Sequence, residues 1–216
     1  MQIISDLFYY IAIVVIGLLP IANPFSTAPI FLAVTSKLDE ESKNKLLKLT
    51  CIYMFSTLII FLLAGALILS FFGISASALR IAGGLIITVL GFRMLFPSSA
   101  PEERKEEVRT YEQAKGLAFT PLAMPMLSGP GSIAVIISMA AQISENDSFL
   151  LRLGGYAVVG LGILVTVVIC WLVLRSSTKI TKILGSSGID ALTRIMGFIL
   201  ICIGVEFAVS GIKGFF

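Results

Sequence analysis

The sequence predicts an all-α, polytopic membrane protein with six transmembrane helices. We expect these helices to form two inverted three-helix repeats, in which the first and fourth helices are discontinuous. Three observations carry this prediction. The chain of 216 residues is 57% apolar and only 13% charged, with a mean hydropathy of +1.00. Its apolar residues fall into six segments, each near the roughly 20 residues that a helix needs to cross a bilayer. A cluster of three prolines also occurs in both the first and the fourth segment.

The six segments cover residues 4–35, 47–72, 76–96, 116–143, 150–174 and 190–212. They divide the chain into a first repeat over 1–96, a linker over 97–115 and a second repeat over 116–216. The linker contains the run PEERKEEVR, which is typical of a solvated connection on the cytoplasmic side. The remaining connections are short, which leaves no room for a soluble catalytic domain.

The proline clusters are the most informative feature of the first and fourth segments. PIANPFSTAP at 20–29 and PLAMPMLSGP at 121–130 share the spacing P-x3-P-x4-P at an offset of 101 residues, and they contain six of the eight prolines. Three spans in each copy invert the second copy in the bilayer, as in many secondary transporters. Counting helical residues places both breaks at similar depths in the membrane. Irregular backbone is tolerated there only when it is buried in protein or lines a polar cavity. The alternative is a pair of kinked helices that merely pack.

A break of this kind offers a defined chemistry. Pro29 and Pro130 suit the first turn of a second half-helix, with Thr27 or Ser26, and Ser128, as caps. The amino terminus of a half-helix carries unpaired N–H groups and partial positive charge, which favour a carboxylate. The carbonyl end of the preceding half-helix suits an ammonium group or a cation. The two breaks together therefore predict a site for a small zwitterion.

Small residues in the clusters indicate that the substrate is small. Ala28, Gly129 and Gly131 allow the backbone to approach a ligand closely. Asn23 is interpreted either as a cap for broken backbone or as a direct substrate contact, and the two roles are compatible. The predicted substrate-binding residues are Asn23, Pro24, Ser26, Thr27, Ala28, Pro29, Pro125, Ser128, Gly129, Pro130, Gly131 and Ser132.

Ionisable and nucleophilic groups are sparse inside the spans. Glu206 is the clearest carboxylate in an apolar segment and is a candidate for proton coupling, although it could instead reach interfacial water. The chain has no histidine, and its three cysteines lie apart in apolar segments, so we expect neither a metal site nor a disulfide. Catalytic motifs of hydrolases and nucleotide-binding loops are also missing. We therefore expect that the protein is not an enzyme and that it binds no cofactor.

The basic residues predict how the chain is oriented. Thirteen of the 16 fall on one side of the six spans, and Arg80, Arg152 and Lys213 fall on the other. The larger group consists of Lys37, Lys43, Lys45, Lys48, Arg93, Arg104, Lys105, Arg109, Lys115, Arg175, Lys179, Lys182 and Arg194. Cytoplasmic loops carry the excess of Lys and Arg, so both termini are expected on the outer side of the plasma membrane. The net charge of +3 reflects this bias and predicts no nucleic-acid partner.

The sequence resembles the MarC family of bacterial and archaeal membrane proteins, which includes neutral amino-acid transporters. NPFSTAPIF at 23–31 and PLAMPMLSGPGSI at 121–133 carry this resemblance, with ALRIAGG and TRIMG in the third and sixth segments. The resemblance covers nearly the full chain. It implies six spans in a prokaryotic inner membrane, discontinuous first and fourth helices, and transport of small neutral amino acids such as glycine and alanine. A channel for small solutes and a non-transporting membrane scaffold are the alternative functions.

Overall fold

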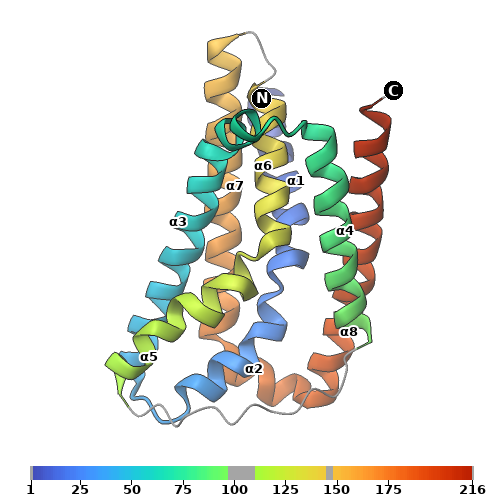
Figure 1. Ribbon diagram of the computed structural model, residues 1–216. Coiled ribbons are helices and arrows are strands. Elements are labelled where there is room, and N and C mark those ends of the chain that lie inside the picture. The colour runs from blue at the N-terminus through green and yellow to red at the C-terminus, as the bar shows by residue number, and fades with distance from the viewer. Residues whose placement is uncertain (1, 97–109, 145–147, 216) are drawn as a thin grey trace.

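The computed structural model describes residues 2–96, 110–144 and 148–215, and every regular element in these ranges is helical (Figure 1). Four helices are individually long and apolar enough to cross a membrane, and there are six spans if each of two bent pairs counts as one. The elements are α1 (Gln2–Ala22), α2 (Pro24–Thr35), α3 (Glu40–Phe72), α4 (Ala76–Leu95), α5 (Tyr111–Leu117), η1 (Ala118–Leu127), α6 (Pro130–Ser144), α7 (Phe149–Arg175) and α8 (Ser177–Lys213).

The predicted breaks in the first and fourth spans are present. Helices α1 and α2 meet at a bend of 48°, and the segment formed by α5 and η1 meets α6 at 64°. Within η1, the backbone leaves helical geometry at Thr120 and Met124, each of which precedes a proline. A residue before proline is sterically pushed out of the helical region, which accounts for both positions.

Three spans begin earlier than the sequence analysis predicts. Helix α3 starts at Glu40 rather than 47, because the Asp39 carboxylate accepts hydrogen bonds from the N–H groups of Glu41 and Ser42. Thr110 forms a capping box with Gln113, so α5 begins at 111 rather than 116. Helix α8 starts at 177 rather than 190, with a break at Gly185. Capping side chains thus extend α3 and α5 beyond their apolar segments, whereas no side chain caps the start of α8. The charged run of the linker, 102–109, lies outside the described residues.

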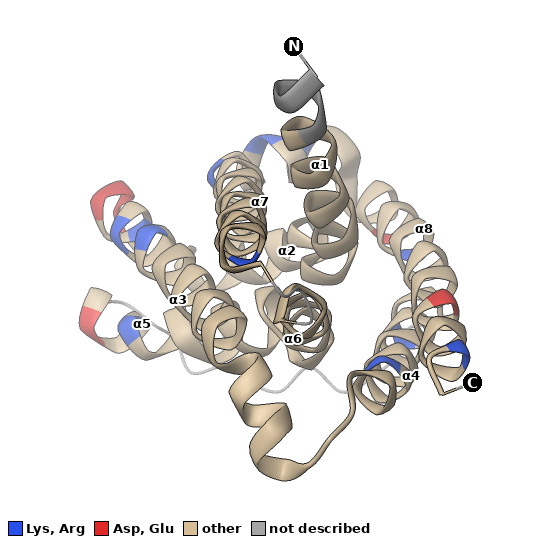
Figure 2. Ribbon diagram, turned by 90° about the horizontal axis from the view of Figure 1, so that it is seen from above, with Lys and Arg blue, Asp and Glu red and all other residues tan. Residues whose placement is uncertain are grey.

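Helices α4 and α8 form a closely packed pair, which we call the α4–α8 pair. Viewed from above, the pair lies beside the group formed by α1, α2, α3, α6 and α7 (Figure 2). Glycines at seven-residue spacing, which is two helical turns, face each other across the pair: Gly84 and Gly91 on α4, and Gly197, Gly204 and Gly211 on α8. A methyl group on Gly91 would lie 2.7 Å from the Gly197 carbonyl oxygen. The two backbones therefore touch, as small residues permit in membrane helices.

This close packing predicts that Gly204→Ala destabilises the protein. A methyl group there would collide with Thr88 Oγ1 and lie 2.6 Å from the Gly84 carbonyl oxygen. Overpacking of this kind costs about 1 to 3 kcal/mol. Gly154→Ala in α7 is the matched control, because nothing lies within 4 Å of the added methyl group. Thermal unfolding in detergent should show a lower melting temperature for the first variant only. Equal melting temperatures would argue against backbone contact in the pair.

The remaining helices form the main bundle. Its core contains Leu18 from α1, Leu58 from α3, Ile136 from α6 and Ile163 from α7, all fully buried. Helix α3 packs on α6 and η1, whereas α7 packs on α1 and α2. The α4–α8 pair contacts this bundle mainly through the broken spans, with α4 on α6 and α8 on α2. The broken spans therefore lie between the pair and the rest of the bundle.

Candidate functional site

The first break is centred on Asn23. Pro20 lies in the last turn of α1, and Pro24 occupies the first position of α2. Between the two helices, Asn23 adopts a left-handed conformation with φ 32° and ψ 70°, which asparagine tolerates better than most residues. Proline at the first helical position loses no hydrogen bond, since the first N–H groups of a helix have no partner within it. The chain can thus change direction inside the span and start a new helix at once.

Hydrogen bonds from Asn23 satisfy the broken backbone. Its side-chain oxygen accepts from the Ser26 N–H at 3.4 Å, which makes Asn23 the cap of α2. Its carbonyl oxygen accepts from Ser26 Oγ at 3.1 Å and from Thr27 Oγ1 at 3.2 Å. Its Nδ2 donates to Met94 Sδ at 3.9 Å, a long contact to a weak acceptor. Asn23 is 3% exposed, so all these contacts lie inside the protein. Capping by Asn23, one of its two predicted roles, is confirmed.

The second break joins η1 to α6 through Ser128 and Gly129. Both the N–H and the hydroxyl of Ser128 donate to the Ala123 carbonyl oxygen, at 2.8 and 2.9 Å. A Cβ atom on Gly129 would collide with the Pro125 carbonyl oxygen, so the close approach of these backbones requires glycine. Pro130 then occupies the first position of α6, as predicted.

Two predicted details of the breaks are wrong. Pro29 lies inside α2 rather than in its first turn, because the cap at Asn23 starts this helix at Pro24. Ser26, Thr27 and Ser128 do not cap the second half-helices. Their hydroxyls donate instead to carbonyl oxygens three to five residues earlier, which also accept backbone N–H groups.

A cavity of about 290 Å³ lies where the two breaks meet the α4–α8 pair. Of the predicted site residues, Asn23, Ser26, Thr27, Pro125, Gly129 and Pro130 line it. The other lining residues are Ile21, Ile30, Leu90, Met94, Met126 and Leu200. The structure thus brings together residues more than 100 positions apart in the sequence. Lysine, arginine, aspartate and glutamate are missing from its lining in the part of the chain that the structure describes.

The other predicted site residues lie outside the lining of the cavity. Pro24, Ala28, Ser128 and Ser132 are buried, and Pro29 is partly buried. The Ser132 hydroxyl has no hydrogen-bond partner among the described residues. Gly131 packs between helices, because a methyl group there would lie 3.0 Å from Ile21 Cγ2 and 3.3 Å from Ile87 Cγ1.

The apolar lining residues were not identified from the sequence. Leu90, Met94 and Leu200 belong to helices in which most positions are apolar, so no local signal separates cavity, core and lipid-facing residues. Their place depends on how the α4–α8 pair packs against the broken spans.

Glu206 lies on an exposed face of α8 and is absent from the cavity lining. Its role in proton coupling stays a prediction. In residues 2–96, 110–144 and 148–215, no three His, Cys, Asp or Glu residues cluster in a way that could hold a metal ion.

The chain is similar to known membrane proteins over most of its length. Residues 8–216 match the family model described as MarC family integral membrane protein. UPF0056 inner membrane protein MarC of Escherichia coli (strain K12) is 40% identical over 212 residues, which cover 96% of each chain. The protein of the same name in Shigella flexneri matches with the same identity and coverage. No solved structure matches the chain.

Proposed function

The chain belongs to the MarC family of integral membrane proteins, and we propose that it is a secondary transporter of small neutral amino acids that works by alternating access. The observation that carries this proposal is the uncharged cavity between two broken helices and a separately packed helix pair. Transporters commonly place their substrate at discontinuous helices near the centre of the membrane. The multi-pass helical architecture and the inner-membrane relatives support the plasma membrane as the barrier that the proposed substrate crosses.

The chemistry of the cavity supports a zwitterionic substrate. Asn23, Ser26 and Thr27 give one wall its polar side chains, and the amino-terminal ends of α2 and α6 lie at the same cavity. The first N–H groups of these helices suit a carboxylate. The carbonyl groups near the breaks suit an ammonium group. Because no charged side chain takes part, a ligand whose own charges cancel fits best.

The size of the cavity supports a small substrate. At about 290 Å³ it lies near the lower limit of small-molecule pockets, which range from about 300 to 1,000 Å³. Glycine and alanine would leave room for water, and large aromatic amino acids would fill it. The family resemblance and the cavity therefore favour the same class of substrate.

The inverted repeat supplies a plan for alternating access. The proline spacing relates the spans α1–α2 and α5–η1–α6 at an offset of 101 residues. The packing follows the same exchange, since α3 packs on the second broken span and α7 on the first, while α4 packs on α6 and α8 on α2. Two inverted copies can exchange their conformations, which gives one state open to each side of the membrane.

We propose the α4–α8 pair as the moving body in this cycle. A glycine with φ 65° lies in the connection to each of its helices: Gly73 between α3 and α4, and Gly185 between α7 and the long part of α8. Nothing would lie within 4 Å of a Cβ atom at either glycine, so no neighbouring element packs on that face of the backbone. Gly185, with ψ −179°, adopts a conformation that is essentially restricted to glycine. These positions suit hinges, because small backbone rotations there would turn the pair as one body.

The orientation in the membrane follows from the basic residues. Helix α1 begins and α8 ends at the same end of the molecule, which we call the terminal end (Figure 1). Thirteen of the 16 basic residues belong to the opposite side by the order of the spans. The positive-inside rule then places the terminal end outside the cell. A cysteine at Lys213 should react with an impermeant thiol reagent in intact cells.

Proteoliposomes test the proposed function. We expect saturable uptake of alanine and glycine, and counterflow when the vesicles are preloaded with unlabelled alanine. A channel would show flux without saturation or counterflow, and a scaffold would show neither uptake nor binding. Uptake at several pH values in the wild type and in Glu206→Gln tests proton coupling. An unchanged pH profile in the variant would remove Glu206 from that role.

A further inference from the structure

The α4–α8 pair gives the cavity a wholly apolar wall, whereas the broken spans contribute all of its polar side chains together with the apolar Ile21, Ile30 and Met126. Asn23, Ser26 and Thr27 supply the polar side chains from the first broken span, whereas Leu90, Met94 and Leu200 come from the α4–α8 pair. A bound amino acid would place its charged backbone groups at the breaks, where backbone N–H and C=O groups are available. Its side chain would then point toward the α4–α8 pair. This inference rests on the proposed function.

Met94 differs from the other apolar residues of this wall. Leu200 is 1% exposed and belongs to the packed core. Leu90 Cδ1 packs toward Gly131 of α6. A methyl group added to Gly131 would lie 3.4 Å from it. Met94 is partly buried, as Leu90 is, but its sulfur alone contacts the break, with Asn23 Nδ2 at 3.9 Å. Its side chain therefore reaches across the cavity from the pair to the break.

The start of the Met94 side chain is held closely, and its far end packs against the core and reaches Asn23. A methyl group on Gly197 would lie 2.9 Å from Met94 Cβ, so α8 fixes the start of the side chain closely. Beyond Cβ, methionine is unbranched and adapts its shape to the space around it. The sulfur is a weak acceptor, so a substrate carboxylate would compete well for the Asn23 amide. A bound substrate would thus displace the Met94 side chain and pack against it.

We propose that Met94 sets the upper size limit of the transported side chain. Shortening Met94 opens the cavity where the substrate side chain ends, because the neighbouring Leu90 and Leu200 are held by packing and cannot fill the space. A longer or stiffer side chain at position 94 closes the part of the cavity where the substrate side chain ends. Met94 is then a specificity-determining residue, and Asn23 provides the opposite boundary of the site.

Two variants with opposite effects test this proposal in proteoliposomes. For Met94→Ala we expect the ratio of leucine to glycine uptake, each measured as kcat/KM, to rise at least about tenfold, since one methylene group in an apolar pocket changes discrimination by roughly 10- to 200-fold. For Met94→Phe we expect alanine uptake to fall relative to glycine. The Phe variant also keeps the proposal testable if the Ala variant folds poorly.

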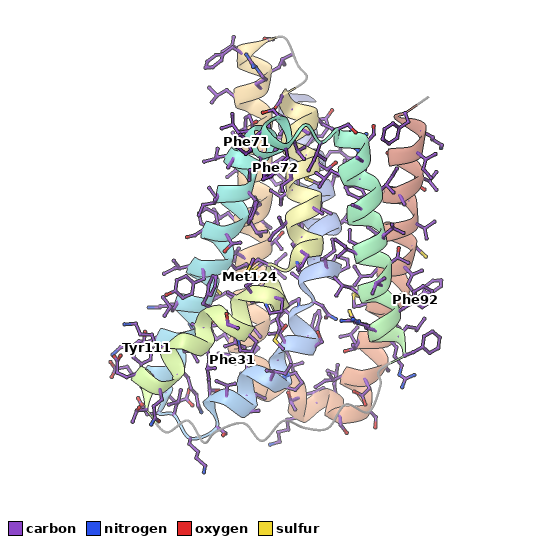
Figure 3. The ribbon with its side chains drawn as sticks, in the orientation of Figure 1. Phe31, Phe71, Phe72, Phe92, Tyr111 and Met124 are labelled. Carbon is purple, nitrogen blue, oxygen red and sulfur yellow. The ribbon has the colours of Figure 1, made fainter. Side chains whose placement is uncertain are left out.

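Two controls separate side-chain size from other effects. Met94→Leu keeps much of the bulk and removes the sulfur, so its leucine-to-glycine ratio should stay within about twofold of the wild type, well below the tenfold change expected for a lost methylene. Phe92→Ala truncates a side chain that projects outward from α4 and is 50% exposed, and its ratio should not change (Figure 3).

The outcomes distinguish this proposal from the proposed function. Normal glycine uptake with an unchanged leucine-to-glycine ratio in Met94→Ala would overturn the role of Met94 alone. If the leucine-to-glycine ratio changed as much in Met94→Leu as in Met94→Ala, the proposal would also be overturned. The sulfur of Met94, and not the size of its side chain, would then determine the substrate preference. Absence of saturable uptake in the wild type would overturn both proposals.

Discussion

A disulfide between cysteines at positions 83 and 134 is expected to abolish amino-acid uptake, and a reductant is expected to restore it. Near the terminal end, α4 and α6 touch closely: a Cβ atom on Gly83 would lie 2.8 Å from the Ala134 Cβ. Farther along, Arg80 Nε donates to Ser138 Oγ at 3.2 Å. Both contacts hold α4 against α6 on the terminal-end side of the breaks. If the α4–α8 pair moves away from α6 during transport, a covalent link here must stop the cycle.

The geometry permits this disulfide with a small adjustment. The Cβ atoms of a disulfide lie about 3.8 Å apart, so the two helices must separate by roughly 1 Å. The variant is made after replacing the three free cysteines, Cys51, Cys170 and Cys202. The reduced double variant serves as its own control, since it contains the same substitutions without the link. Uptake is measured in proteoliposomes before and after oxidation.

A second cysteine pair provides the matched control. A Cβ atom on Gly162 of α7 would lie 2.6 Å from the Val14 Cβ of α1, so this pair requires a similar adjustment. Both helices belong to the main bundle, and their link should leave uptake unchanged. Uptake that persists in the oxidised 83–134 variant would show that the α4–α6 interface stays closed during transport. The α4–α8 pair would then not be the moving body.

The breaks were predictable because the chemistry of proline is local. A missing N–H and a fixed φ interrupt a helix wherever proline occurs, so Pro20, Pro24 and Pro125 marked the correct spans. The start of α2 was not predictable in the same way. It depends on Asn23, whose left-handed backbone and capping side chain begin the helix at Pro24 rather than at Pro29.

The roles of small residues depend on tertiary packing, and the sequence could not assign each one. Gly84 and Gly204 are packing positions, because their helices meet backbone to backbone. Gly131, in contrast, was assigned to the substrate but packs against Ile21 and Ile87. A glycine that approaches a ligand and one that approaches a helix look the same in one sequence. Met94 gave no signal, because its position comes from the pairing of α4 with α8.

Asn23→Asp is expected to retain the fold and to lose uptake. Aspartate has the shape of asparagine, is an equally good helix cap, and its charge interacts favourably with the amino terminus of α2. It can still accept the hydrogen bond from the Ser26 N–H. It lacks the Nδ2 donor, however, and it would repel a substrate carboxylate. The variant thus preserves the capping role of Asn23 and removes its proposed substrate contact.

The expected loss follows from the hydrogen bond that is removed. A hydrogen bond to a charged group contributes about 1.5 to 3 kcal/mol, which is roughly 10- to 150-fold in affinity, and repulsion adds to it. Glycine binding, measured by calorimetry, should therefore weaken by at least about tenfold. The melting temperature in detergent should fall, because a carboxylate at this buried position loses its hydration, but the cap should keep the protein folded.

Two further variants identify which part of Asn23 matters. Asn23→Gly keeps access to the left-handed backbone but removes both the cap and the donor, so stability and binding should both fall. Thr27→Val removes a hydroxyl that donates to the Asn23 carbonyl oxygen, and we expect a smaller loss of binding than in Asn23→Asp. Wild-type binding and uptake in a folded Asn23→Asp protein would rule out the amide as a carboxylate donor. Asn23 would then act as a helix cap alone, and substrate recognition would rest on the backbone N–H groups of α2 and α6.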